Sequence, residues 1–290
     1  MDNELGQRFE QHRDHVRMVA YRMLGSLAEA EDAVQEAWLR LGSVDADGIG
    51  NLAGWLTTVV SRVCLDMLRA RRFRREDLVG HDLPGGAGPV VGDDPEHEAV
   101  LVDSVGRAVL VVLDRLGPDE RIAFVLHDMF AVPFDEIAPL VERSVSTTKK
   151  LASRARRKVR GHSELSAEEL ARRRRVVEAF LAASRAGDLD AVVEVLSPTV
   201  IRRADRYAIA DDRPGEVRGA RAVAGEVAVF GRGARFATAV LVDGSVGLAV
   251  APHGRLRLVV VFTIDGDRIA EYRLVADPGE LERLELAVLA

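Results

Sequence analysis

The sequence predicts a multidomain chain, in which two all-α parts, the second with a helix-turn-helix, precede an α+β part. Apolar residues recur every three or four positions through both helical stretches. Proline, glycine and acidic residues fill the segment between these stretches, from residue 77 to 95. Toward the C-terminus the apolar period shortens to that of strands, with Asp-Gly turns between them. Helices followed by an antiparallel sheet make an α+β domain.

The composition favours a cytoplasmic protein with a packed interior. Of the 290 residues, 48% are hydrophobic and only 5% are aromatic, so the cores must be largely aliphatic. The single cysteine, Cys64, excludes an internal disulfide framework and a cysteine-rich zinc site. No apolar run approaches the roughly 20 residues of a membrane-spanning helix, and the charged N-terminus lacks a signal-peptide core. We therefore expect no membrane partner.

The first helical part predicts three helices, over about residues 5–23, 27–41 and 52–74. In the second of these, an apolar stripe runs from Leu27 to Leu41, and the opposite face carries acidic and amide side chains. A loop rich in glycine and aspartate, residues 42–51, precedes the third helix. That helix ends in an arginine block, with five arginines among the seven residues from Arg69 to Arg75.

The second helical part contains a short helix, a tight turn and a basic helix. Phe134, Ile137 and Leu140 form the apolar side of the short helix, which contains Pro139. Ser144 is placed to cap the basic helix. The predicted inner face of the basic helix comprises Leu151, Ala155 and Val159. A short helix followed by a basic helix with polar residues in its first turns is typical of a DNA-binding helix-turn-helix.

Charge is distributed in blocks, although the formal net charge is −6. Besides the arginine block, the segments Lys149–Arg160 and Arg172–Arg175 are basic, whereas Glu76–Gly106 contains no Lys or Arg. Binding to phosphates depends on local clusters rather than on the total charge. Separate basic runs at helix ends favour DNA as a partner over a merely solvated helix face.

Four motifs in order give the chain a resemblance to a known family. AEDAVQEAWLRL looks like the polymerase-docking helix, and GWLTTVVSRVCLDMLRARRFRRE like the promoter −10 helix, of bacterial extracytoplasmic-function (group IV) RNA polymerase sigma factors. PFDEIAPLVERSVSTTKKLASRARRKV resembles their −35 helix-turn-helix. FLAASRAGDLDAVVEVLSP, followed by VRGARAVA and a closing sheet, is similar to the SnoaL/NTF2-like cone. This order resembles the sigma-J type branch, which carries a C-terminal SnoaL-like domain.

The resemblance implies five segments. Residues 1–76 form sigma region 2, for polymerase docking and −10 recognition, and residues 77–97 an acidic Gly/Pro linker. Residues 98–162 form sigma region 4, for −35 recognition. Residues 163–175 are a basic connector, and residues 176–290 a SnoaL-like regulatory domain.

The resemblance also implies partners and binding residues. The function is that of an alternative sigma factor, with core RNA polymerase and promoter DNA as partners and its own C-terminal domain controlling activity. The expected polymerase-binding residues are Asp32, Gln35 and Glu36. The expected DNA-binding residues are Arg62, Arg69, Arg71, Arg72, Ser146, Thr147, Lys149, Lys150, Arg154 and Arg157. The loop from Asp45 to Asn51 lies where an unstacked promoter base would bind. No catalytic residue, metal or cofactor is expected, and an unidentified small ligand of the cone is left open.

The chain departs from the family pattern in its turn and linker. The helix-turn-helix turn has Glu142 and Arg143 where the family usually has glycine, so one of them would adopt a left-handed conformation at a cost. The linker keeps Leu83-Pro84 but lacks the branch's tryptophan. The late family motif survives partly around Asp277-Pro278.

Two other classes of function remain as alternatives. The chain would be a ligand-sensing regulator, or a SnoaL-like enzyme, carrying a degenerate sigma module. The candidate catalytic groups are His253, in the turn Pro252-His253-Gly254, and a cluster of Arg202, Asp205 and Tyr207 at the cone mouth. The sequence favours the simpler interpretation, in which the turn histidine is a surface residue and the other three form a surface cluster. Retention of the acidic docking residues argues against a regulator that no longer binds polymerase.

Overall fold

The computed structural model describes residues 3–45, 48–78, 106–210 and 213–289. The chain divides into two compact units. The helical unit comprises the described residues up to Leu78 and residues 113–157, and the cone unit comprises residues 106–112 and the described residues from Lys158 onward. Most of the predicted linker, with the expected helix start at Asp94-Pro95, lies outside the described residues.

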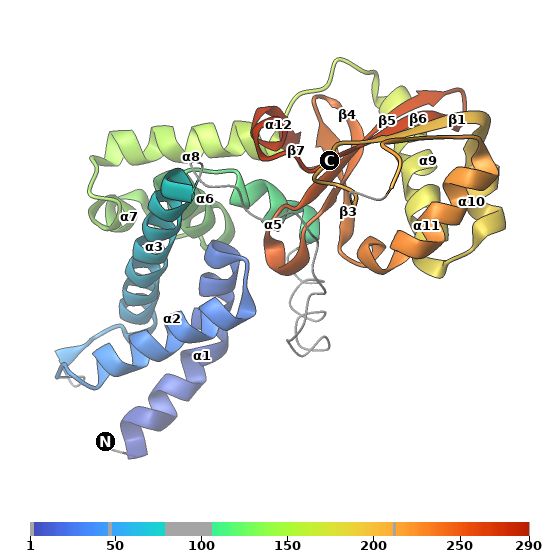
Figure 1. Cartoon of the computed structure of the whole chain (residues 1–290). Helices are drawn as coiled ribbons and strands as arrows, with labels where there is room; N and C mark the ends of the chain where they lie inside the picture. The colour runs from blue at the N-terminus through green and yellow to red at the C-terminus, as the bar shows by residue number, and fades with distance from the viewer. Residues whose placement is uncertain (1–2, 46–47, 79–105, 211–212, 290) are drawn as a thin grey trace. The chain divides into compact units, whose positions relative to one another are not determined.

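The helical unit confirms the predicted succession of helices (Figure 1). Its elements are α1 (Asn3–Leu24), α2 (Leu27–Leu41), α3 (Leu52–Leu78), α6 (Pro118–Phe124), the π-helix η2 (Val125–Met129), α7 (Phe134–Leu140) and most of α8 (Val145–Arg160). Gly25 ends α1 with a φ of 75°, and the Ser26 hydroxyl caps α2 by accepting from the Glu29 N–H. No helix among the described residues is long and apolar enough to cross a membrane.

The helices α1, α2 and α3 pack around an aliphatic core, as the composition predicts. Its fully buried members include Val16, Val19, Met23, Val34, Leu41, Leu56 and Val60. The apolar period of the sequence favours Val59 and Met67 as buried positions of α3, but both are only half-buried. The buried positions are instead their neighbours, Val60 and Leu68. Phe9 and Trp38 join α1 to α2, with ring centroids 4.8 Å apart.

The helix-turn-helix is present as α7, a four-residue turn and α8. The Ser144 hydroxyl caps α8 by accepting from the Thr147 N–H at 3.2 Å, as predicted. Glu142 adopts the left-handed conformation, with a φ of 55°, where a residue with a Cβ is strained by about 1–2 kcal/mol. Pro139 lies inside α7, which ends one residue later at Leu140. The buried face of α8 is Thr148, Ala152 and Ala155, and the predicted Leu151 and Val159 are half-buried.

The cone unit is an α+β fold in which helices pack on a seven-stranded sheet. Its helices are residues 107–112 of α5 (Arg107–Asp114), α9 (Ala167–Ala186), α10 (Leu189–Val195), α11 (Ala220–Ala234), the 3-10 turn η3 (Pro252–Gly254) and α12 (Pro278–Arg283). Its strands are β1 (Leu196–Ala204), β2 (Glu216–Arg218), β3 (Ala237–Val242), β4 (Ser245–Val250), β5 (Leu258–Asp265), β6 (Arg268–Val275) and β7 (Leu286–Ala287).

The seven-stranded sheet has the order β2-β1-β6-β5-β4-β3-β7 and is mixed, not antiparallel throughout as predicted. Strands β3 to β6 form an antiparallel meander through the predicted Asp-Gly turns. However, β1 pairs with β6 in parallel, with Arg202 beside Tyr272. The reason is that β1 enters the sheet from α10 and lies against the last long strand, a partner far away in the sequence.

Each face of the sheet packs on its own apolar cluster. One face is covered by α9, α10 and α11 (Figure 1), which contribute Phe180, Val192 and Val223. The other face packs on residues of α5 and α12, including Val111, Val112 and Leu281. Val159 also lies against this second cluster, and its carbonyl accepts from the Val288 N–H at 2.8 Å. The cone unit therefore includes residues 106–112 and 158–162 of the second predicted helical part.

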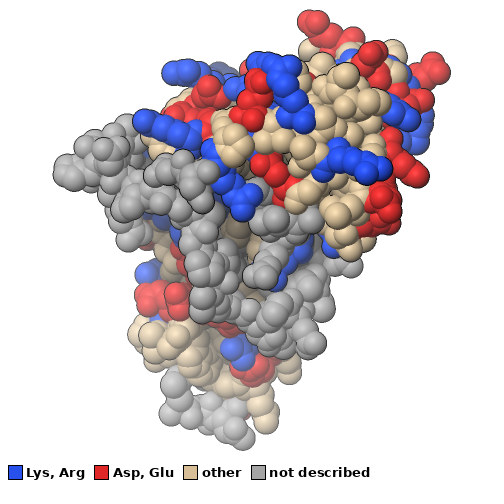
Figure 2. All heavy atoms as spheres, turned by 45° about the vertical axis from the view of Figure 1, so that its right-hand side comes forward, with Lys and Arg blue, Asp and Glu red and all other residues tan. Residues whose placement is uncertain are grey.

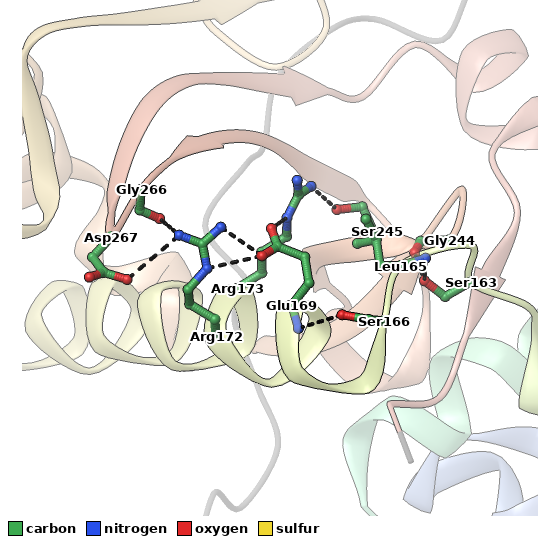
Figure 3. A network of polar contacts seen from close by, with 10 residues as sticks. All are labelled: Ser163, Leu165, Ser166, Glu169, Arg172, Arg173, Gly244, Ser245, Gly266 and Asp267. Carbon is green, nitrogen blue, oxygen red and sulfur yellow. Dashed lines mark hydrogen bonds and ion pairs between the residues drawn. The ribbon is translucent and has the colours of Figure 1, made fainter.

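The basic run Arg172–Arg175 lies in α9 and is built into the cone unit. The helix α9 begins at Ala167, within the predicted connector 163–175. Glu169 bonds both Arg172 and Arg173, which also reach the Gly266 carbonyl and the Ser245 hydroxyl (Figure 3). The hydrogen bonds from Arg173 and then Arg172 lower the pKa of Glu169. These two arginines thus join α9 to two turns of the sheet.

Candidate nucleic-acid and polymerase interface

The predicted docking residues share one exposed face of α2. Asp32 and Gln35 are exposed, and Glu36 is half-exposed and accepts from the Arg40 Nε at 2.9 Å. Leu39 lies one turn further along the same face, because positions 32, 35, 36 and 39 follow helical spacing. Its exposed fraction of 58% is large for a leucine. Leu39 was not among the predicted docking residues. The sequence does indicate its exposure, because Leu39 lies outside the apolar stripe of α2.

The predicted arginines of α3 are in three different situations. Arg62 and Arg72 are exposed. Arg69 is half-buried, and its Nη2 lies 3.2 Å from the Asp119 Oδ1. Arg71 is held inside the unit, where it donates to the Leu24 carbonyl at 3.1 Å and pairs with Glu29, leaving 11% of its side chain exposed. In this conformation Arg71 links α3 to the junction of α1 and α2, and its guanidinium group is already bonded within the unit.

The polar face of α8 is accessible as predicted. All six predicted DNA-binding residues of this helix are exposed: Ser146, Thr147, Lys149, Lys150, Arg154 and Arg157. The Lys149 ammonium lies 6.0 Å from the centroid of the Phe134 ring, at the outer limit of a cation–π contact. Arg156, which the prediction omitted, is half-buried and bonds Asp128 on η2. The helix therefore separates an exposed basic face from an arginine used in packing.

The lone cysteine belongs to the core of the helical unit. Cys64 is fully buried on α3, and this burial raises the pKa of its thiol well above the ordinary range. A buried neutral thiol of this kind packs as a small apolar side chain. No cluster of three or more metal-ligating side chains occurs among the residues that the structure describes.

Comparison with known proteins decides the family. Residues 8–74 match the model of Sigma-70 region 2, and residues 106–159 match that of Sigma-70 region 4. The ECF RNA polymerase sigma factor SigJ of Mycobacterium tuberculosis is 43% identical over 253 residues, which are 84% of this chain and 80% of SigJ. The chain belongs to the ECF RNA polymerase sigma factors.

This sigma factor has further relatives of the same kind. The probable ECF RNA polymerase sigma factor SigI of M. tuberculosis is 41% identical over 67% of either chain. The crystal structure of M. tuberculosis SigJ aligns with 95% of this chain and 97% of that one, at 31% identity and a TM-score of 0.46. The predicted family membership and the predicted role as an alternative sigma factor are confirmed.

In this sigma factor, the region 4 match extends into the cone unit. The match begins at residue 106, and residues 106–112 belong to the cone unit together with Val159 at its end. In the loop predicted to hold a promoter base, residues 46–47 lie outside the described part. Asn51, the last residue of that loop, caps α3 by accepting from the Gly54 N–H at 3.0 Å.

The residues proposed for catalysis do not assemble into one site. Arg202 is 1% exposed and is bound to Glu226 and to the Pro214 carbonyl inside the cone, so its predicted place at the cone mouth is wrong. Asp205 is used by backbone groups, accepting from the N–H groups of Tyr207, Ala208, Ala276 and Asp277. Tyr207 is exposed, and His253 lies in the 3-10 turn η3.

Aromatic side chains pack together inside the cone. Phe180 contacts both Phe262 and Tyr272, with centroids 5.6 Å apart in each case, beside the Arg202–Glu226 pair. A separate shallow hollow of about 420 Å³ lies where α10, β1 and α11 meet, with Arg221 and Arg268 on its rim. Figure 2 shows basic and acidic side chains interspersed on one face of the molecule. A small ligand of the cone stays a prediction.

Proposed function

We propose that this sigma factor binds core RNA polymerase through the exposed face of α2 and contacts promoter DNA through α3 and α8. The main support for the proposal is that each of the two regions matched to sigma-70 models presents an exposed face, acidic on α2 and basic on α8. The face of α2 presents Asp32 and Gln35 beside Leu39, and the face of α8 presents Lys149, Lys150 and Arg154. A protein that joins a polymerase to DNA needs both.

The proposal assigns no chemistry to the protein itself. The family lends promoter specificity to a polymerase that performs the reaction. Two of the groups considered for catalysis, Arg202 and Asp205, are used in hydrogen bonds to backbone groups. In vitro transcription with core polymerase, with and without this protein, tests the proposal. Promoter-dependent transcripts only when the protein is added are expected, and their absence with every promoter fragment of the source genome would refute it.

Lys150→Gln is expected to weaken binding of the polymerase complex to promoter DNA and to lower the slope of log K against log[salt] by about 1, because one phosphate contact is lost. Arg154→Gln should behave alike, unless Arg154 reads a base, in which case preference at one position relaxes by about 1–3 kcal/mol. Fluorescence anisotropy over a salt series measures both. The control is Arg156→Gln, because Arg156 bonds Asp128 instead. The same slope of log K against log[salt] in all three variants would show that the α8 face contacts solvent and not DNA.

We further propose that the cone controls activity. Support comes from the cone unit's own contents, because residues 106–112 and Val159 of the region 4 match pack on its sheet. A structural change in the cone would therefore move residues at both ends of the region 4 match. The Asp205 carboxylate accepts hydrogen bonds that hold the segment around Asp277 to the loop after β1. Loss of these hydrogen bonds would release the segment.

Asp205→Ala is expected to change promoter-dependent transcription by several-fold without lowering the amount of polymerase bound. It removes the acceptor of four backbone N–H groups and frees the closing segment in the full chain. Truncations that remove residues 277–290 or 176–290 complete the series, and a cone that inhibits predicts more DNA binding by the free protein lacking residues 176–290. Unchanged transcription in all three would refute control by the cone.

A further inference from the structure

Asp119 lies between two arginines that come from different parts of the helical unit. It is the second residue of α6, next to the C-terminal half of α3 (Figure 1). Its Oδ1 is 3.2 Å from the Nη2 of Arg69 on α3, and its Oδ2 is 3.5 Å from the Nη2 of Arg143 in the helix-turn-helix turn. Each carboxylate oxygen thus faces a different guanidinium group.

The geometry of this cluster is that of an anion site. Two guanidinium groups converge on two oxygens that carry one negative charge, which is also the charge and the oxygen chemistry of a phosphodiester. Arginine is the side chain best suited to such oxygens, because its planar fork offers several donors. The sequence reasoning selected Arg69 as a DNA contact and passed over Arg143, whose side chain is 53% exposed.

The cluster is accessible enough to exchange its anion. The exposed fraction of the Asp119 side chain is 21% and that of Arg69 is 32%. Ion pairs at this depth stabilise a protein only slightly, since water screens both charges. A polyanion that presents many phosphates can therefore compete with one carboxylate.

We propose that Arg69 and Arg143 form a phosphate-binding site, and that Asp119 occupies this site while the protein is free of DNA. Asp119 is then an internal substitute for a backbone phosphate, and it lowers the affinity of the free sigma factor for DNA of any sequence. This inference rests on the proposed DNA-binding function of α3 and the helix-turn-helix. It adds a site, its ligand class and the residue that blocks it.

A separate contact joins α1 to the end of η2 and does not involve Asp119. The Phe130 ring, after η2, lies under the Arg22 guanidinium at 5.0 Å and meets the His15 ring edge at 5.5 Å. Burial, and next the neighbouring His12, lowers the pKa of His15, so the ring packs there as the neutral form near pH 7. Asp119→Asn therefore leaves the packing of α1 on the η2 end intact and removes only a charge.

The test measures binding of the full-length free protein to a labelled duplex of unrelated sequence by fluorescence anisotropy. Asp119→Asn is expected to tighten binding by about five- to twentyfold at low salt and to steepen the salt dependence by about one phosphate contact. The matched control is Glu194→Gln, which makes the same charge change at an exposed position of α10 in the cone unit and frees no arginine of the proposed DNA-binding elements. The gain should disappear when Asp119→Asn is combined with Arg69→Gln and Arg143→Gln.

Two results would overturn the inference. One is an Asp119→Asn affinity within twofold of the Glu194→Gln affinity, which would mean that only net charge matters. The other is a gain that survives loss of both arginines. Thermal unfolding of each variant verifies that the fold is kept. The proposed function is tested separately by transcription with core polymerase, so its failure would not resemble either of these outcomes.

Discussion

Asp32→Lys combined with Glu36→Gln is expected to abolish recovery of core RNA polymerase on the tagged sigma factor. Asp32 is exposed at the centre of the α2 face, and a lysine there would meet a basic polymerase surface with like charge, which costs several kcal/mol at an interface. That cost corresponds to a loss of at least a hundredfold in affinity. Glutamine at position 36 removes a charge without placing a cation beside Arg40, to which Glu36 is bonded.

The control for this experiment is Glu194→Lys, a charge reversal at an exposed position of α10 in the cone unit. It should leave recovery of polymerase unchanged, and circular dichroism should verify that both proteins remain helical. Leu39→Ser should give an intermediate loss, because an exposed leucine beside the acidic residues can supply apolar contact area. Undiminished recovery with the double variant would refute docking through α2.

Glu226→Ala is expected to destabilise the cone unit by about 3–5 kcal/mol, since it leaves the Arg202 guanidinium buried without its counter-charge. Arg202 is 1% exposed and donates to Glu226 through two nitrogens and to the Pro214 carbonyl at 2.9 Å through the third. Hydrogen exchange of the β1 and β6 amides in the full chain measures this loss. Both tryptophans, Trp38 and Trp55, lie in the helical unit, so their fluorescence reports the other unit separately.

Two further variants separate the charge from the packing. Glu178→Ala removes a partner from the exposed pair with Arg174, where about 0–1 kcal/mol is at stake. Arg202→Met combined with Glu226→Leu replaces the buried pair by apolar side chains and should recover most of the stability. If Glu226→Ala lowered the stability of the cone unit no more than Glu178→Ala does, Arg202 would not depend on Glu226 as its buried partner.

The helices and most strands were predictable because their patterns are local. The stripe of α2, the cap at Ser144 and the strained turn at Glu142 are each encoded within a few residues. The parallel pairing of β1 with β6 was not predictable, since alternation identifies a strand but not its neighbour. The antiparallel prediction failed for that reason.

The same distinction applies to the candidate site. The exposed face of α8 followed from its own helical period. Within the arginine block of α3, however, Arg71 and Arg72 look alike in sequence, and only the approach of Glu29, on another helix, makes Arg71 structural. Asp119 likewise gave no local sign that it would reach Arg69 and Arg143.

The place of β1 in the sheet also bears on the order in which a new chain folds. Ile201 pairs with Glu271, so the sheet cannot close until β6 has been synthesised. The bundle of α1, α2 and α3 needs only contacts between neighbouring helices, and such contacts form faster than pairings between distant segments. Domains fold as units, with N-terminal ones first during synthesis. A growing chain would therefore hold a folded bundle of α1, α2 and α3 before it holds a folded cone, so the element proposed to control activity matures after the element proposed to bind polymerase.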